Sequence, residues 1–537
     1  MTTDITRSTF QPSKHYSGVL QQQGRVQLDA DWNEQIAIEA HRDQTMTRDV
    51  VGSCGAPMEN AGFGMIDVAD LSADEQARLT DLGILPLANG DFLIDHGRFY
   101  VDGILCENEE TISVVHQPDL LDGPPIDAAG RYLIYLDVWQ RHITALEDPS
   151  IREVALGGPD TTTRLKTVSQ VKAMPVVDEG DGTHCLSTFS DWTGLVTPTS
   201  ASLNARGAPE SVETGPCIVP PGAGFRRLEN QLYRVEIHRG GDIGEATFKW
   251  SRINASTVSA WLGQSGTDQE RLQISNTGPD DLLGFAGGRS VELTDDAREL
   301  RNQPGTLVAL TRVDEDILTI NPASRLHPAE DSIDRADFPH HPKIRRWDSP
   351  SELPVEVPAE NSGWISLEDG VEIRFEAGPY ESGQFWLIPA RTLTGDVEWP
   401  RDNGDPVPQP PHGIEHHYCR LALIDAVETE AGLQLTPVDC RPIFPPLTLM
   451  TSFFYLNGDG QEAMPDPTAP GALLPLAAPL QVGVANGQEP VSGATVRFTV
   501  TEGHGRVQGS TGPIDVTTGA DGVAVCAWEL DSGTQSQ

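Results

Sequence analysis

The densest group of potential metal ligands in the sequence is His412, His416, His417 and Cys419. Zinc accepts imidazole nitrogen and thiolate sulfur, and a closed zinc site needs four ligands that converge on one point. The segment continues as HYCRLALI, which predicts a strand, and alternate side chains of a strand face opposite sides. His417 and Cys419 then share one face and His416 lies on the other. We therefore interpret the group as structural and predict no metal there.

Two further groups contain histidine. Glu236 and His238 share one face of a predicted strand and could act together as acid and base. Strand alternation offers a simpler explanation, because it places such polar residues on the solvent face of a half-buried strand. His340 and His341 lie in a Pro-rich loop and form a weaker metal candidate.

Three acidic groups could hold a cation. Asp29, Asp31 and Glu34 lack the Gly and the downstream Glu of a calcium loop, so we assign them to the electrostatics of a helix N-terminus. The loops Asp402-Asn-Gly-Asp405 and Asn457-Gly-Asp-Gly460 offer oxygen ligands in patterns of low specificity.

Local signatures of catalysis are missing from the sequence. It contains no GxSxG, HExxH, P-loop or dinucleotide-binding motif. Glycosidases that use a carboxylate pair need no local motif, so a polysaccharide depolymerase stays an alternative. The sequence predicts a protein that is not an enzyme, with no catalytic residue, no cofactor and no metal.

The elements that carry these residues begin with a helix predicted over residues 25–51. Leu28, Trp32 and Ile36 recur at intervals of four, and Met46 continues the stripe. Because the stripe is narrow, we expect it to be buried against another chain or against the following domain. These four residues are the predicted assembly contacts.

The rest of the chain predicts a fold that is mainly β. A second helix is expected at 72–82, with Ser72 as its N-cap and Gly83 as its stop. Short apolar or alternating runs separated by turns predict strands, the clearest at 132–139, 231–238, 371–375, 418–424, 480–485, 494–500, 514–518 and 523–528. The expected fold is a set of β-sandwich or barrel-like units with an N-terminal helix and a C-terminal immunoglobulin-like sandwich.

A chain of 537 residues is too long for one hydrophobic core. Composition shifts divide it into an arm and docking helix, two β-rich domains (the first with a short helical insertion), two linkers (the first rich in Gly, Pro and Ser) and an immunoglobulin-like domain. The expected ranges are 1–55, 56–177, 178–225 (linker), 226–445, 446–471 (linker) and 472–537.

Charge and cysteine content limit the partners and the compartment. The net charge of −42 opposes binding to nucleic acid and to anionic membranes, and it would suit a basic partner. The seven cysteines contain no CxxC pair, and their odd number leaves at least one outside any intrachain bond. The polar N-terminus lacks a secretory signal, and no stretch reaches the ~18 apolar residues of a membrane span. We therefore expect synthesis in a reducing cytoplasm, without membrane insertion.

Residues 10–35, FQPSKHYSGVLQQQGRVQLDADWNEQ, resemble the opening of an uncharacterised family of β-rich proteins encoded with phage tails and contractile injection systems. Further strings resemble the same family over about residues 7–445: YLDVW with EDP, ALGGPD, LENQLYRVEIH with FKWSR, WLIPAR and GIEHHY. The resemblance implies a structural protein at the baseplate periphery or in a fibre-like extension of such a particle. It carries no catalytic residues.

The resemblance also implies partners and a location. The expected partners are further copies of the chain in a homo-oligomer, other baseplate or tail proteins, and a possible cell-surface target, with no nucleic acid. The expected location is an assembled contractile particle, either inside the cell or released by lysis. A receptor- or glycan-binding adhesin is the first alternative and a tail-spike depolymerase the second.

Residues 472–537 resemble a bacterial immunoglobulin-like domain of the invasin and intimin type, through PVSGATVRF and the turn GADG before the strand at 523–528. Such a sandwich needs about seven strands, and only four convincing ones are visible after residue 480. We therefore expect an incomplete domain. Either the natural chain continues past Gln537, which we favour, or a neighbouring subunit donates the missing strand.

Overall fold

The mainly β class is confirmed. The computed structural model describes residues 2–121, 123–177, 183–209, 224–358, 363–465, 468–469, 471–487 and 489–532, with 38% strand and 14% helix. The chain forms two compact units. Unit 1 comprises Met1–Ala56 and Ala61–Pro442, and unit 2 comprises Pro57–Asn60 and Ile443–Gln537.

The first part of unit 1 is a β-sandwich whose central strand is the apolar run YLIYLDVW. One sheet has the order β26 (Gly432–Asp439), β25 (His417–Thr429), β7 (Gly130–Ile143), β8 (Arg164–Val176). Facing it are β1 (Cys54–Pro57), β4 (Gly97–Val101) and β5 (Ile104–Asn108). Residues 132–139 of β7 are buried on both faces, as continuous hydrophobicity predicts.

The pairing of β7 with β25 changes the expected domain boundaries. Leu136 lies opposite Cys419 and Ile134 opposite Ala422, although they are far apart in sequence. Residues 61–177 and most of 226–445 therefore share one unit, whereas the sequence predicts two separate domains. Hydrophobic periodicity reveals the strands but not which strand pairs with which.

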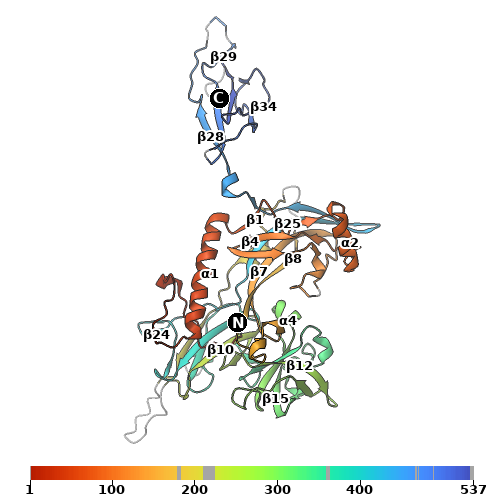
Figure 1. The fold of residues 1–537 in the computed structure, drawn as a ribbon, viewed down its shortest axis with the longest axis vertical. Helices are drawn as coiled ribbons and strands as arrows, with labels where there is room; N and C mark the ends of the chain where they lie inside the picture. The colour runs from red at the N-terminus through yellow and green to blue at the C-terminus, as the bar shows by residue number, and fades with distance from the viewer. Residues whose placement is uncertain are drawn as a thin grey trace. The chain divides into compact units, whose positions relative to one another are not determined.

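The second part of unit 1 contains a five-stranded sheet, a three-stranded sheet and a closed barrel. The five-stranded sheet is β18 (Leu353–Pro354), β11 (Thr247–Ser251), β10 (Gln231–Arg239), β21 (Phe385–Arg391), β22 (Asp396–Val397). It shares a core with β19 (Ile365–Ser366), β20 (Val371–Phe375) and β9 (Leu203–Gly207). The barrel order is β12 (Val258–Ser265), β13 (Arg271–Ile274), β16 (Ile317–Asn321), β15 (Thr306–Asp314), β14 (Arg289–Thr294), β17 (Lys343–Trp347). Figure 1 labels β10 of the five-stranded sheet and β12 and β15 of the barrel.

The predicted linker at 178–225 contains regular structure. The helix α3 (Ser190–Val196) lies within it, and β9 pairs with β20 from Leu203 opposite Phe375 to Gly207 opposite Val371. Residues 178–182 and 210–223, including Cys217, lie outside the described residues.

Both predicted helices are present. α1 (Asp29–Val51) is the long helix labelled in Figure 1, and α2 (Ala73–Asp81) carries the predicted N-cap. The Ser72 side chain accepts a hydrogen bond from the Glu75 backbone N–H, and the Glu75 carboxylate accepts one from the Ser72 N–H, which is a capping box. α2 packs over the small sheet of β2 (Met65–Ile66), β3 (Leu93–Ile94) and β6 (Ile112–Ser113) through Leu79 and Leu93. Among the described helices, none is both long and apolar enough to cross a membrane.

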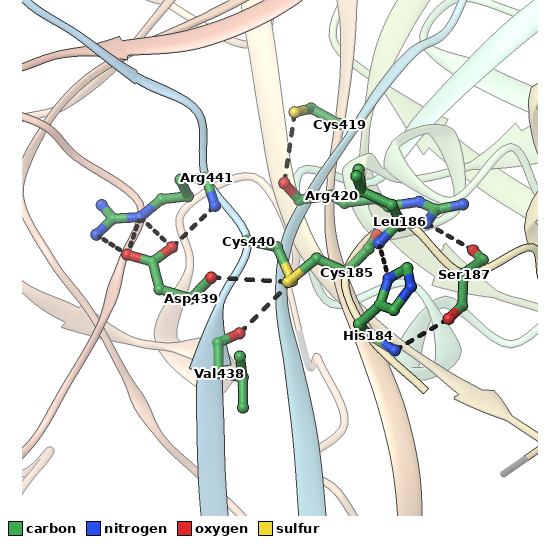
Figure 2. The surroundings of a disulfide bond; sticks show 10 residues. All are labelled: His184, Cys185, Leu186, Ser187, Cys419, Arg420, Val438, Asp439, Cys440 and Arg441. Carbon is green, nitrogen blue, oxygen red and sulfur yellow. Dashed lines mark hydrogen bonds and ion pairs between the residues drawn. A yellow bond between two sulfur atoms is a disulfide. The ribbon is translucent and has the colours of Figure 1, made fainter. Parts of the chain in front are cut away.

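A disulfide joins Cys185 to Cys440 across 255 residues of sequence, as Figure 2 shows. It ties the segment before α3 to the chain just after β26. Arg420 of β25 supports the same segment by donating hydrogen bonds to the Cys185 and Ser187 carbonyls at 2.6 and 2.8 Å. No sequence pattern predicts this pairing, because the two cysteines share no motif.

Unit 2 contains more strands than expected. From Thr451 onward its strands are β28 (Thr451–Asn457), β29 (Leu473–Pro475), β30 (Leu480–Asn486), β31 (Glu489–Pro490), β32 (Thr495–Phe498), β33 (Arg506–Val507), β34 (Ile514–Thr517), β35 (Val523–Cys526) and β36 (Trp528–Asp531). Of the seven strands from residue 480 on, β31, β33 and β36 were not among the four expected, so the count of four was wrong. β28 lies inside the range 446–471 that we interpreted as a linker. The tail at 533–537 lies outside the described residues.

Candidate functional site

α1 presents an apolar stripe to solvent. The side chains of Leu28, Trp32, Ile36, Met46 and Val50 are 49–61% exposed. With about 3.6 residues per helical turn, Met46 returns to the direction of Leu28, and Val50 to that of Trp32. We call these five residues the α1 stripe. The sequence predicts that either another chain or the following domain buries this stripe. In the described part of the chain the following domain does not cover it, so that second possibility is excluded.

The opposite side of α1 is held in place by unit 1. Ala30 and Ile38 are 3% and 1% exposed. Gly103 sits in the two-residue turn between β4 and β5 with a positive φ of 83°, and a Cβ there would lie 2.2 Å from the Gln44 carbonyl oxygen. Only glycine allows this close approach, so the helix position is fixed independently of the stripe.

The acidic residues at the start of α1 tie down the N-terminal arm. Asp29 accepts hydrogen bonds from the Thr6 backbone N–H and hydroxyl, both at 2.8 Å, and Glu34 accepts one from the Thr9 hydroxyl at 2.6 Å. Burial raises the pKa of Asp29, but the Thr6 hydrogen bonds outweigh it, so the pKa is below its ordinary value. These carboxylates position the arm along the helix.

The histidine group is divided as strand alternation predicts. The His416 Nδ1 lies 2.6 Å from Asp137 Oδ1, and the His417 Nδ1 lies 3.0 Å from Asp102 Oδ2. His412 accepts a hydrogen bond from the Leu387 backbone N–H at 3.0 Å.

Cys419 is buried in the sandwich core. A hydrogen bond with Cys54 and burial raise the pKa of its thiol. A neutral thiol is a poor zinc ligand. His412, His416, His417 and Cys419 therefore have separate structural environments, and the geometry brings no zinc-like set together.

Glu236 and His238 are not on a solvent face, which corrects our interpretation of that strand. His238 is 1% exposed, and its ring nitrogens lie 3.3 Å from Glu352 and 3.8 Å from Glu292. Glu236 forms ion pairs with Arg234 at 2.5 Å and with Lys249 at 3.2 Å. The barrel covers this face of β10. Strand alternation correctly predicts that Glu236 and His238 share a face, but it does not show that another part of the chain packs against that face.

The remaining loop candidates have structural roles. Asn403 and Gly404 form the two-residue turn between β23 (Arg401–Asp402) and β24 (Asp405–Pro406), both with positive φ. In the other loop, Asp459 accepts a hydrogen bond from the Tyr455 hydroxyl at 2.6 Å.

A buried ionic cluster forms where β7, the barrel and α4 (Asp296–Leu300) meet. The Lys343 Nζ, on a residue 2% exposed, lies 2.6 Å from Glu147, 2.8 Å from Asp296 and 2.9 Å from Glu299. Arg141 lies 2.8 Å from both Asp296 and Glu299. Among the described residues, Glu147, Asp296 and Glu299 are the one set of three His, Cys, Asp or Glu ligand atoms close enough to share a metal. The ammonium of Lys343 contacts all three carboxylates.

His341 lies at the edge of this cluster, with its Nδ1 2.7 Å from Asp296 Oδ2, whereas the neighbouring His340 contributes backbone contacts to Asp295 and Asp296. The pair thus does not act as one site.

The cluster keeps its carboxylates ionised. Burial raises the pKa of Glu299, but Lys343, Arg141 and Arg345 outweigh it, so the pKa is well below the ordinary value. The same balance, set by Arg234 and Lys249, lowers the pKa of Glu236 to about 2. Buried charges are stable only when paired in this way.

A cavity of about 160 Å³ adjoins this cluster and the ion pairs of β10. Its walls include Glu236, His238, Lys249, Glu292 and Glu299. Lys249 lies 2.6 Å from Glu292. These charged and polar side chains give the cavity walls that suit ordered water.

A family model matches residues 1–193 and 193–508. The chain belongs to a family of unknown function, DUF6519. No curated protein and no solved structure matches the chain. The family match extends past residue 445, where the resemblance noted in the sequence ends, and so includes β28 to β33 of unit 2.

Sequence reasoning missed the ionic cluster. Arg141, Glu147, Asp296, Glu299 and Lys343 come from three distant segments and form no motif. One signal was available, because the chain has only five lysines, and two of them, Lys249 and Lys343, are almost fully buried. A rare residue type inside a core is an indication of a paired charge.

Proposed function

We propose that this protein is a structural component of a phage-tail-like contractile injection system, located at the baseplate periphery or in a fibre-like extension, and that it acts by protein–protein assembly. The observation that carries the proposal is the exposed α1 stripe. It begins within the residues that carry the resemblance to phage-tail proteins, which end in DADWNEQ at the start of α1.

The stripe has the properties of an assembly surface. Scattered exposed apolar residues are ordinary, but several of them along one side of a fixed helix are characteristic of an interaction site. Trp32 is well suited as its anchor, since Trp is enriched among the residues that dominate binding energy. The proposed occupant is another protein of the particle, and further copies of the chain contribute by symmetry.

The acidic surface supports protein partners over nucleic acid. A net charge of −42 repels phosphate backbones, while it permits association with a neutral or basic protein surface. A cell-surface target of the assembled particle is compatible with the same charge.

Two observations weigh against the alternatives. Glycan-binding adhesins present Trp in shallow grooves, whereas seven of the ten Trp residues here are at most 7% exposed. A tail-spike depolymerase needs a carboxyl with a raised pKa as general acid. In the ionic cluster burial raises the pKa values of Glu147, Asp296 and Glu299, but Lys343 opposes it at all three and Arg141 at Asp296 and Glu299, so all three pKa values are lowered.

The test is incorporation of variants into particles. Trp32→Ala should reduce the fraction of the chain that co-sediments with assembled particles, because a fully packed Trp contributes about 3–5 kcal/mol. Leu393→Ala is the matched control, since Leu393 is 98% exposed and lies outside α1. If Trp32→Ala enters particles as well as Leu393→Ala does, docking through the α1 stripe is wrong.

A further inference from the structure

The strand β28 of unit 2 is an exposed apolar strand at the edge of a sheet. Phe453, Phe454, Tyr455 and Leu456 are 41–68% exposed, and every residue of the strand is exposed. The core of unit 2 is built from other strands and does not include these side chains. The fold of the unit therefore does not account for them.

One side of β28 is paired and the other is open. β28 forms an antiparallel ladder with β30, from Thr451 opposite Asn486 to Asn457 opposite Gln481. β31 and β35 occupy the other side of β30. Among the described strands, none pairs with the outer edge of β28. An open edge of this kind presents unpaired N–H and C=O groups that can extend the sheet.

The position of β28 on its own sheet is well defined. Phe454 lies opposite Gly483, and a Cβ on Gly483 would lie 2.5 Å from the Phe454 ring, so the ring lies directly over the glycine. This aromatic–glycine contact holds the strand in register with β30. The open edge is thus presented in one fixed conformation.

The absence of charge along β28 indicates which kind of partner can pair with this edge. From Pro442 through Gly458 the sequence contains no Asp, Glu, Lys or Arg, in a chain in which 22% of residues are charged. A partner recognised by charge would have nothing to contact on the strand. Two acidic copies of the chain repel each other in general, but along this neutral edge they can approach closely. Exposed edges are normally protected by charged residues, and this edge has none.

The strand is also compatible with a copy of itself. In an antiparallel pair related by a twofold axis near Phe454, Phe453 of one copy lies opposite Tyr455 of the other. Such aromatic cross-strand pairs are stabilising. We propose that β28 is a homodimerisation edge, at which a second copy of this chain adds its own β28 to extend the sheet. This proposal does not rest on the α1 stripe or on the proposed particle.

The dimer should be reversible, because one strand pair buries less than a standard protein interface. Sedimentation velocity of the full chain should show a monomer–dimer equilibrium that depends on protein concentration. Added salt should strengthen the dimer, because it screens the repulsion between acidic subunits and leaves the neutral contact intact. If salt weakens the association, or if the chain is a monomer throughout the accessible concentration range, the proposal is wrong.

Substitutions locate the contact. Phe453→Glu places a carboxylate opposite Tyr455 of the second copy, where burying an unpaired charge is costly, and should weaken association by at least about tenfold. Phe453 is 68% exposed, so the fold of unit 2 should be unaffected. Met464→Glu is the matched control in the same unit, at a residue 91% exposed, and Trp32→Glu tests the α1 stripe. Both should still dimerise, and a dimer that persists in Phe453→Glu or is lost in Trp32→Glu would overturn the proposal.

Hydrogen exchange distinguishes a second copy from cover within the same chain. Amides of residues 451–457 should become more protected as protein concentration rises, and Phe453→Glu should abolish the increase. Protection that is independent of concentration would mean that another part of the chain covers the edge, which contradicts the proposal.

Discussion

The ionic cluster and the α1 stripe both depart from the usual distribution of residues between core and surface. The cluster buries charged side chains, and the stripe exposes apolar ones. At the cluster, Lys343 and three carboxylates are withdrawn from water. On α1, Trp32 and its apolar neighbours remain in water, although the same helix buries Ile38. Both regions belong to unit 1.

The difference concerns where each kind of contact is completed. The buried charges form their ion pairs with other residues of the same chain. These ion pairs connect β7, α4 and the barrel. The side chains of the α1 stripe stay 49–61% exposed among the described residues, so their full burial would require another molecule. A buried charge therefore reports on the fold of one chain, and an exposed apolar row reports on assembly.

Removing the charge at the centre of the cluster should have the largest effect. Lys343→Met leaves three carboxylates without the ammonium that neutralises them, and it should lower the free energy of unfolding by about 3–5 kcal/mol. Lys166→Met is the matched control, because Lys166 forms one exposed ion pair with Asp119 at 2.7 Å. Such a pair contributes about 0–1 kcal/mol. Thermal and denaturant unfolding compare the two, and equal losses would contradict the role given to the cluster.

The disulfide gives a second measure of what holds the interior of unit 1. Cys185→Ser should lower stability by about 2–4 kcal/mol, because the bond restricts the unfolded chain. Cys440→Ser should have the same effect, and the double variant should lose no more than either single one. Melting temperatures of the oxidised proteins test this. Free thiols at both positions, found by mass mapping of the oxidised protein, would show that the bond does not form.

Acid should unfold the chain through the carboxylates of the buried charges. Because the pKa of Glu236 is lowered from 4.5 to about 2, its contribution to stability is present above pH 4.5 and is lost as pH falls toward 2. Protonated Glu resembles Gln, so the difference in melting temperature between the natural protein and Glu236→Gln should shrink over this range. A difference that stays constant with pH would mean that Glu236 does not titrate as described.

The α1 stripe should contribute least to the stability of a single chain. Trp32→Ala should change the free energy of unfolding by no more than about 0.5 kcal/mol, because it removes an exposed side chain. Ile38→Ala, on the buried side of the same helix, should cost about 2–5 kcal/mol. Urea denaturation of the isolated subunit measures both, and a large loss in Trp32→Ala would place the stripe in the fold.

The sequence by itself determined the local elements of this protein. The alternation in VEIRF predicted residues 371–375, the bounds of β20, and Ser72 predicted the start of α2 as its N-cap. The apolar run at 132–139 predicted a strand buried on both faces. These features depend on neighbouring residues, whose spacing is visible in the sequence. The exposed Trp32 stripe was also visible as a helical pattern, although its exposure was not.

Only the tertiary structure decided how distant segments meet. Nothing local to Leu136 or Cys419 indicates that β7 and β25 pair, and nothing local to Lys343 indicates that Glu147 and Asp296 will surround it. A polar residue on a strand can face solvent or a charged partner, and periodicity is the same in both cases. For this reason, strand alternation predicts a solvent-exposed face for Glu236 and His238. Whether they are buried depends on the barrel that packs against β10, and burial by a distant segment is a property of the folded chain.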